Sequence, residues 1–375
     1  MDFDFNSEQY QLRDSVRTFL DDQWGPRKLR AAPGTFSSEL WRGLCELGLQ
    51  TLLVPEAQGG AGLGFVDLAL VLEEFGRALV PASMADTLLA SDVIARFGTP
   101  GQRESLLPRI AAGECRIAFA HAQSGAGHQA TEVTLAAERV AGGEWRLRGE
   151  KILVPGAGCA THLLVSAKPY GGSAGLFLCE ANQRGVSTQA HRAVDADSLL
   201  GKVVFDGASA QPAGEGPDAR ALTHLLETSA LAASLQMAGI AAAALDIAVA
   251  YAKQRTQFDR LIGSFQAIKH KCADMLVALE GARTAAYYAA WAVGEDDAAL
   301  RLAVSMAKAV AGDACRAVCN DALQIHGGVG FTWDYDIHFY LKRGKLFEYA
   351  FGDAAFHRER VATEMFAAAE VAGVL

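Results

Sequence analysis

Two short segments in the second half of the chain combine residue types that suit the binding of a phosphate-bearing group. In the first, Arg255–Met275, the planar guanidinium of Arg255 can hold two phosphate oxygens at once. In the second, which begins at Gln324, Gly327 and Gly328 have no Cβ, so the backbone can lie directly against a bound molecule. Taken singly, each has an ordinary explanation, as a surface cation and as a loop that ends a helix. Their joint occurrence favours an anion-binding role.

The other reactive side chains form no catalytic or metal-binding pattern. The seven cysteines are scattered and include no C-x-x-C pair, which predicts buried free thiols in a reducing cytosol. No cluster of His, Cys and Asp has the spacing of metal ligands, so no metal is expected. His270 and His326 are expected to pack or form hydrogen bonds rather than to transfer protons.

The charge balance limits the classes of partner. The chain has 34 Lys and Arg against 43 Asp and Glu, and its net charge of −9 argues against nucleic acid or an anionic membrane. The acidic N-terminus lacks the basic and apolar regions of a signal peptide. The apolar stretch Thr228–Ile247 consists of small residues that suit helix packing better than lipid. We therefore expect a cytoplasmic protein.

The distribution of proline predicts the elements that hold the two segments. All ten prolines lie at or before Pro217, whereas Asp218–Leu375 is rich in Ala and Leu. Proline breaks helix interiors and alanine favours them, so this half of the chain should form an antiparallel bundle of long helices. The helices are expected at about 219–254, 264–293, 297–325 and 335–371.

The first half of the chain divides into two patterns. Residues 6–113 show helical periodicity, whereas short apolar runs between Arg116 and Asp206 suit six or seven strands of a compact barrel or sandwich. No helix is expected between these strands, which excludes a Rossmann domain, and residues 208–217 are expected to form a linker. The predicted fold class is mainly α with a small β domain. The predicted domains are a helical domain at 1–115, a β-barrel at 116–215 and a four-helix bundle at 216–375.

Four stretches of the chain resemble the acyl-CoA dehydrogenase family, which has this order of helical domain, barrel and bundle. They begin at Phe5, Leu52, Arg255 and Gln324. The last two resemble the family's R-x-x-F-G-x-x-I-x-x-F-Q and Q-x-x-G-G-x-G-[FY] motifs. The resemblance extends over essentially the whole chain and implies the family's fold and an FAD-dependent oxidoreductase.

The resemblance implies that FAD accepts a hydride from the β-carbon of an acyl-CoA thioester while a carboxylate removes a proton from the α-carbon. It also implies that the two segments bind the flavins of neighbouring subunits, so that oligomerisation is part of cofactor binding. The cofactor contacts that it implies are Arg255, Phe258, Phe265 and Gln266 at one flavin, Gln324, Gly327 and Gly328 at a partner's flavin, and Gly125 and Val154 near the flavin ring.

The usual catalytic carboxylate is missing from this sequence. Most family members carry the base as Glu in a Y-E-G-T motif, and the corresponding position here is Phe351. A minority place it on the first long bundle helix, where this chain has Ser229. Asp353 is the nearest carboxylate to the lost glutamate and is a weak candidate base. Its more ordinary interpretations are a helix N-cap, a partner of Arg358 or a salt link to His357.

The segments expected at the flavin ring are altered as well. Ala122–Gln129 stands where the family has T-E-P-G-A-G-S-D, and Leu153–Pro155 stands where it has W-I-T. Pro155 has no N–H to offer to the flavin. Asp259 replaces the glycine of R-x-x-F-G and puts an anion beside Arg255. The scaffold motifs therefore persist while cofactor and catalytic positions have changed.

The resemblance also implies partners. Gly352–Arg358 resembles a branch of the family whose members often pair with a second family member in the breakdown of steroids or alicyclic acids. A homo- or heterotetramer is therefore expected, and an electron-transfer flavoprotein could accept the electrons. The basic run Lys342–Lys345 could face a CoA phosphate, although a solvated helix face is the expected interpretation.

Three functions remain open at the level of the sequence. The first is an acyl-CoA dehydrogenase-type subunit that acts on a bulky acyl-CoA together with a catalytic partner. The second is a homo-oligomeric flavoenzyme with other acyl-CoA chemistry, such as elimination, in which Asp353 is the base or no base is needed. The third is a flavin-free subunit that serves as a scaffold or binds CoA thioesters. Neither the acyl group nor the oligomeric state follows from the sequence.

Overall fold

The structure is a computed structural model that describes residues 4–125, 127–129, 132–140, 142–295 and 297–371. The chain forms two units, each with its own internal contacts. We call them the bundle unit (Met1–Ala31, Phe65–Val80 and Ala230–Leu375) and the sheet unit (Ala32–Gly64 and Pro81–Ser229). The boundaries of the three consecutive domains expected from the sequence stay a prediction.

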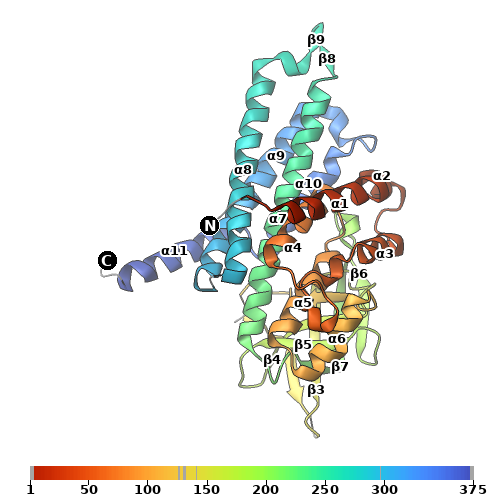
Figure 1. The fold of residues 1–375 in the computed structure, drawn as a ribbon, viewed down its shortest axis with the longest axis vertical. Helices are drawn as coiled ribbons and strands as arrows, with labels where there is room; N and C mark the ends of the chain where they lie inside the picture. Colours follow the sequence, from red (N-terminus) through yellow and green to blue (C-terminus); the bar gives the residue numbers. More distant parts are fainter. Residues whose placement is uncertain (1–3, 126, 130–131, 141, 296, 372–375) are drawn as a thin grey trace. The chain divides into compact units, whose positions relative to one another are not determined.

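The bundle unit is built from long helices, as the proline-free half of the sequence predicts. Helices α8 and α9 lie side by side, and α11 extends away from the rest of the bundle unit (Figure 1). Its helices are α1 (Ser7–Gln23), α2 (Pro26–Ala31), α4 (Phe65–Arg77), the part of α7 (Ala219–Ala252) that follows Ser229, α8 (Gln266–Glu295), α9 (Asp297–His326), α10 (Ile337–Tyr349) and α11 (Ala354–Val371).

Two glycines bring α4 and α7 into backbone contact within the bundle unit. A Cβ added to Gly76 would lie 2.0 Å from the carbonyl oxygen of Gln236. One added to Gly239 would lie 1.9 Å from the carbonyl oxygen of Glu73. No larger residue fits at either position without moving a helix. Helix α7 is long and apolar enough to span a membrane, but 83% of its most apolar window is buried, as expected of a core helix.

The fourth long helix predicted at 335–371 is in fact two helices. The break between α10 and α11 falls at Ala350–Asp353, where Phe351 has φ +57° and Gly352 has φ +100°. The buried ammonium of Lys308 holds this break by donating to the carbonyls of Glu348 (3.0 Å) and Gly352 (2.7 Å). The prediction was wrong because these tertiary hydrogen bonds override the helical pattern that continues on both sides.

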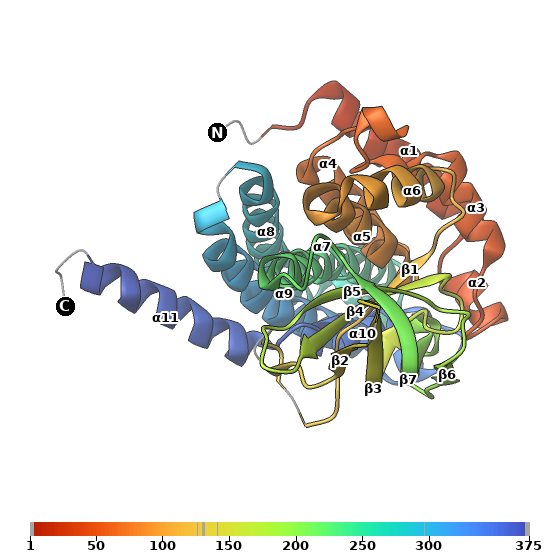
Figure 2. The same ribbon diagram turned by 90° about the horizontal axis from the view of Figure 1, so that it is seen from below.

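The sheet unit contains the small β domain expected from the sequence. Its seven strands lie in the order β1-β4-β2-β3-β7-β5, β6 pairs with β7, and pairing of β4 with β5 closes the sheet like a barrel (Figure 2). Leu147, Val165 and Phe177 are among the side chains that fill its core. The strands are β1 (Ile117–Ala120), β2 (Ala136–Arg139), β3 (Trp145–Pro155), β4 (His162–Pro169), β5 (Gly175–Glu180), β6 (Val186–Ala190) and β7 (Leu200–Pro212). The helices are α3 (Ser38–Glu46), α5 (Ser83–Phe97) and α6 (Pro100–Ala111), and α7 begins in this unit.

The predicted linker at 208–217 is a further correction. Strand β7 continues to Pro212, which lies opposite Phe177 of β5. Proline is tolerated there because it is the last residue of the strand. Strand β6 was not among the predicted strands, since its exposed Ser, Thr and Gln give no apolar pattern. The fold class itself, mainly α with a small barrel, is confirmed.

Candidate functional site

The first predicted binding segment forms a short hairpin in the bundle unit. Strands β8 (Thr256–Gln257) and β9 (Arg260–Leu261) flank a two-residue turn at Phe258 and Asp259, which have φ values of +53° and +61°. Both residues therefore adopt the left-handed backbone conformation, which is common for Gly or Asn and energetically costly for Phe. The Phe258 side chain is 87% exposed, and the guanidinium of Arg260 lies 3.9 Å from the centre of the Phe265 ring. The turn thus presents an aromatic side chain to the outside.

A hollow of about 440 Å³ brings the two predicted segments together in the bundle unit. Arg255 and Gln257 line it from the hairpin side, and His326 and Gly328 from the end of α9 and the turn that follows. The Arg255 side chain forms no ion pair with any described residue, so its guanidinium is free to meet an anion. The remaining lining residues are Tyr251, Ile262, Ile325, Val329 and Thr332.

The glycines of the second segment leave space on their open side. Gly327 has φ +66°, a conformation that favours glycine, and a Cβ added at Gly327 or Gly328 would meet no atom within 4 Å. Arg255 and Gly328 therefore border the same hollow in one chain, where one phosphate-bearing group could contact both. The assignment of the two segments to the flavins of neighbouring subunits stays a prediction. Gln266 and Gln324, which belong to the same two segments, are exposed and do not line this hollow.

His326 forms part of the wall of this hollow. Its ring stacks on Tyr251 with a centroid separation of 4.3 Å, and its Nδ1 lies 2.7 Å from the carbonyl oxygen of Ala322. Burial lowers the pKa of His326, although the hydrogen bond to Ala322 opposes this effect. A neutral, stacked imidazole is the packing group that the sequence analysis expected.

The sheet unit carries the segments expected near a flavin ring. Gly125, with φ +75°, lies in the exposed loop after β1, where Ala126 falls outside the described residues. The side chain of Val154 is 1% exposed and packs in the barrel core, so only its main chain could contact a cofactor. The outward side chain of this strand end is Leu153, which has φ +53° and is 51% exposed. Sequence alignment alone could not distinguish these two orientations, because a bulge at this point interrupts the alternation of β3.

The positions of the usual catalytic bases hold no proton acceptor suited to the reaction. Phe351 occupies the break between α10 and α11. Ser229, on α7, is 2% exposed, and its hydroxyl has no hydrogen-bond partner among the described residues. Asp353 caps α11, since its Oδ1 accepts a hydrogen bond of 2.9 Å from the backbone N–H of Phe356. Arg358 pairs with Asp313 rather than with Asp353. The N-cap interpretation of Asp353 is therefore the one that the geometry supports.

The basic run Lys342–Lys345 is not a solvated helix face. Arg343 is fully buried in α10 and donates to the carbonyl of Val80 at 2.5 Å. Lys345 pairs with Glu348 at 2.7 Å. The ammonium of Lys342 lies 5.6 Å from the ring centre of Trp333. These cations therefore take part in helix packing and local pairs, and the expectation of a solvated helix face was wrong.

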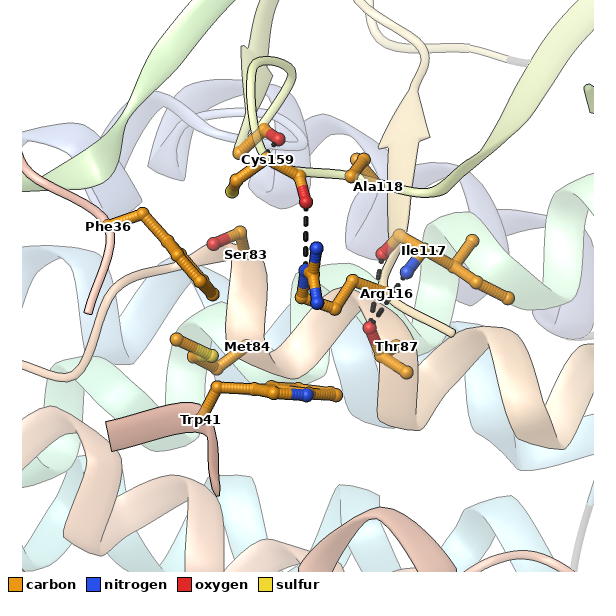
Figure 3. Close-up of a pocket in the computed structure, with 11 residues that line it drawn as sticks. Phe36, Trp41, Ser83, Met84, Thr87, Arg116, Ile117, Ala118 and Cys159 are labelled. Atoms are coloured by element: carbon orange, nitrogen blue, oxygen red, sulfur yellow. Dashed lines mark hydrogen bonds between the residues drawn. The ribbon is translucent and has the colours of Figure 1, made fainter. Parts of the chain in front are cut away.

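Two further cavities lie in the sheet unit. The smaller has about 10 Å³, room for a single water, beside Arg116, whose Nε donates to the Cys159 carbonyl at 2.8 Å (Figure 3). It is too small for an acyl chain. The larger is an open hollow of about 470 Å³ between the Gly34–Phe36 loop, strand β6 and the start of β7. The described residues contain no group of three or more His, Cys, Asp or Glu that could hold a metal ion.

Known proteins share both the sequence motifs and the fold. The family model "Acyl-CoA dehydrogenase, N-terminal domain" matches residues 6–114, and "Acyl-CoA dehydrogenase, C-terminal domain" matches 219–366. A variant of the Tcur3481-Tcur3483 steroid ACAD is 33% identical, with a TM-score of 0.89 over 97% of this chain and 99% of that one. The ChsE4-ChsE5 complex from Mycobacterium tuberculosis is 29% identical, with a TM-score of 0.88 over 97% and 99%.

A third solved structure has the family's cofactor. An acyl-CoA dehydrogenase complexed with FAD from Bacillus anthracis is 25% identical, with a TM-score of 0.90 over 99% of this chain and 70% of that one. The two family models, the near-complete coverage of a structure with one-third identity and the paired binding segments agree with one another. The chain therefore belongs to the acyl-CoA dehydrogenase family of FAD-dependent oxidoreductases.

Proposed function

We propose that this chain is the base-deficient subunit of a heteromeric acyl-CoA dehydrogenase and that a second family member supplies the catalytic carboxylate. The observation that carries the proposal is Phe351, which stands at the family's glutamate position in the break between α10 and α11. Similarity to the Tcur3481-Tcur3483 steroid ACAD and to the ChsE4-ChsE5 complex supports pairing with a second chain.

The proposed cofactor contacts fit the phosphates of FAD. The free guanidinium of Arg255 would neutralise the pyrophosphate, and Gly327 and Gly328 would let the backbone approach it. Phe258 and Phe265 would pack against the cofactor or the neighbouring subunit from the hairpin, while Gln266 and Gln324 would donate from the flanking helices. Gly125 and the main chain of Val154 would border the flavin ring from the sheet unit.

The reaction that we propose is the α,β-dehydrogenation of an acyl-CoA thioester. FAD, when bound, accepts the hydride from the β-carbon. Removal of the α-proton needs a carboxylate in a dry pocket, and neither Phe351 nor Ser229 can provide one. This chain would hold and orient the cofactor and shield it from water, and its partner would take the proton. A bulky acyl group such as a steroid or alicyclic acid is the substrate class that we favour, by analogy with the steroid ACAD.

The contacts that hold the helix break support an ordered site at Phe351 that lacks only the base. Lys308 and the Gly352 conformation hold the backbone, and His357 Nε2 lies 2.9 Å from the carbonyl oxygen of Phe351. These contacts hold Phe351 in a left-handed conformation of the kind that is often found at functional sites. We infer that the partner uses this surface in the assembled enzyme, within a cytoplasmic tetramer that passes electrons to an electron-transfer flavoprotein.

The remaining hypotheses are less well supported. One carboxylate oxygen of Asp353 caps α11, which disfavours its use as a base in a homo-oligomeric enzyme. The hollow, which is lined by an arginine without an ion pair among the described residues and by Gly328, disfavours a flavin-free scaffold.

One set of measurements tests the proposal. The purified chain is first examined by absorbance and mass spectrometry for FAD, and then co-expressed with family members encoded beside it. We expect FAD-containing heteromers that oxidise acyl-CoA and a lone chain that does not. Stoichiometric FAD and acyl-CoA oxidation by the lone chain would refute the need for a partner, and a colourless heteromer would refute the flavin.

A further inference from the structure

A buried lysine in the sheet unit joins three separate segments of the chain. Lys151, on β3, is fully buried. Its Nζ donates to the backbone carbonyl of His121 at 2.8 Å, to Oε1 of Gln123 at 2.8 Å and to Oγ of Ser166 on β4 at 2.9 Å. His121 and Gln123 flank Ala122, the first residue of the Ala122–Gln129 loop. These three bonds therefore fix where this loop leaves β1.

None of the three acceptors is a carboxylate. Burial lowers the pKa of Lys151 to about 7. Burial also lowers the pKa of His121 to about 3, with smaller contributions from Lys151 and His128, so this imidazole stays neutral at physiological pH. The groups that face Lys151 are His121, which directly follows β1, Gln123 from the loop and Ser166 from β4, and the residue opposite it on β7 is the apolar Val203.

Ser166 connects the lysine to the ring of His121. Its Oγ lies 2.9 Å from Lys151 Nζ and 3.0 Å from His121 Nδ1. A hydroxyl has a single proton to donate, so the direction of one bond fixes the direction of the other. When Lys151 is an ammonium, Ser166 accepts from it and donates to Nδ1, which leaves the imidazole proton on Nε2. When Lys151 is an amine, its lone pair accepts from Ser166, and Nδ1–H donates to Ser166.

We propose that Lys151 is a positioning residue for the Ala122–Gln129 loop and that its protonation state sets the tautomer of His121 through Ser166. In the change, Lys151 loses one proton to solvent. His121 releases a proton from Nε2 to water and takes one up at Nδ1, so the imidazole stays neutral. Nε2 of His121 thereby changes from a donor to an acceptor. Any effect of this change at Nε2 on a bound flavin rests on the proposed function, whereas the tautomer change itself does not.

Nuclear magnetic resonance of the full chain with isotopically labelled histidine tests the proposal. The His121 signals are assigned by their loss in His121→Asn. We expect the Nε2–H tautomer at about pH 6 and the Nδ1–H tautomer at about pH 8.5, with a midpoint near the pKa of Lys151. One tautomer over this whole range would overturn the proposal.

Three variants make the test specific. Ser166→Ala keeps the lysine but breaks the chain of bonds, so the tautomer should no longer follow pH. Gln123→Glu gives Lys151 a carboxylate partner and should move the midpoint upward by at least about one pH unit. Lys168→Met removes an exposed lysine from the same strand as Ser166 and should leave the transition unchanged. A transition that survives Ser166→Ala, or a midpoint that Gln123→Glu does not move, would contradict the proposal.

The same titration with and without FAD separates this proposal from the proposed function. A chain that binds no flavin but shows the tautomer change would refute the proposed flavoenzyme function and support the coupling of Lys151 to His121. A flavin-containing enzyme in which His121 keeps one tautomer would support the flavoenzyme function and refute the coupling of Lys151 to His121.

Discussion

Phe351 keeps a backbone conformation that its side chain does not favour. A non-glycine residue in the left-handed region costs roughly 1–2 kcal/mol, and the surrounding hydrogen bonds from Lys308 and His357 must offset this cost. These hydrogen bonds fix the backbone of the helix break, so a substitution at position 351 changes the chemical group that the break presents. This leads to a test by substitution.

Phe351→Glu should restore a base to this chain. We expect acyl-CoA to reduce the bound flavin of the variant in an anaerobic absorbance experiment, with a rate ~10²–10⁴-fold above that of the parent chain, the usual contribution of a general base. Phe351→Gln, which has the same length without the charge, is the matched control and should stay inactive. If Phe351→Glu retains FAD and still reduces no flavin, the retained break does not present the base position.

The buried Lys151 predicts a dependence of stability on pH. Its pKa is about 7 in the folded chain against 10.5 in the unfolded chain, so between these values the unfolded state holds more protons. The free energy of unfolding should therefore rise with pH over this window, and this gain is lost as the pH falls towards 7. Relative to Lys151→Met, we expect a gain of up to ~1.4 kcal/mol per pH unit between pH 7 and pH 9 in urea unfolding. A constant difference between the two proteins would contradict the low pKa.

At the scale of the elements, the sequence predicted those whose pattern is local. The absence of proline after Pro217 and the abundance of alanine were sufficient for α7, α8 and α9. The break at Phe351 was missed because its cause is Lys308, 43 positions earlier in the chain, and no local pattern reports that contact. Strand β6 was missed because its side chains are exposed, and the burial of Val154 because a bulge shifts the alternation.

Part of the candidate site could also be predicted from local patterns in the sequence. Arg255 and Gly328 belong to recognisable motifs, and the structure brings them to one hollow. Tyr251 was not singled out, since a lone aromatic on a helix is usually a core residue. Its stacking on His326 depends on the meeting of α7 with the end of α9.

The β8–β9 hairpin gives a prediction about cofactor affinity. Asp259 has φ +61° and puts a negative charge four residues from Arg255. Asp259→Asn removes the charge and tolerates the conformation, while Asp259→Gly also relieves the strain. Both should tighten FAD binding, with Gly the stronger, by up to about tenfold, equivalent to ~1.4 kcal/mol. Fluorescence titration of FAD into the apoprotein measures this, and unchanged affinity in both variants would place the pyrophosphate elsewhere.

At the scale of the whole molecule, the bundle unit exposes large apolar side chains. Val277 on α8 is 73% exposed and Phe366 on α11 is 61% exposed, in addition to Phe258 of the hairpin. Exposed apolar side chains of this size on several elements are typical of surfaces that another chain covers. Cofactor binding should therefore depend on association.

Dilution should release FAD if the cofactor is held between subunits. We expect FAD occupancy, followed by absorbance after rapid filtration, to fall together with the mass measured by analytical ultracentrifugation. Phe258→Ser should shift both transitions to higher protein concentration, whereas Tyr170→Ser, a substitution of an exposed aromatic in the sheet unit, should shift neither. FAD retained fully by the monomer would show that one chain completes the site.

The glycine contact between α4 and α7 has a consequence for how the protein opens. Because Gly76 and Gly239 place the backbones in contact, the two helices cannot slide past each other by a turn. Glu73 of α4 also accepts hydrogen bonds from Arg283 and Tyr287 of α8, and Glu74 binds Arg17 of α1. Segments far apart in the chain should therefore exchange their amide hydrogens as a single cooperative unit, in which α1 and α4 are protected for as long as α7 and α8 are.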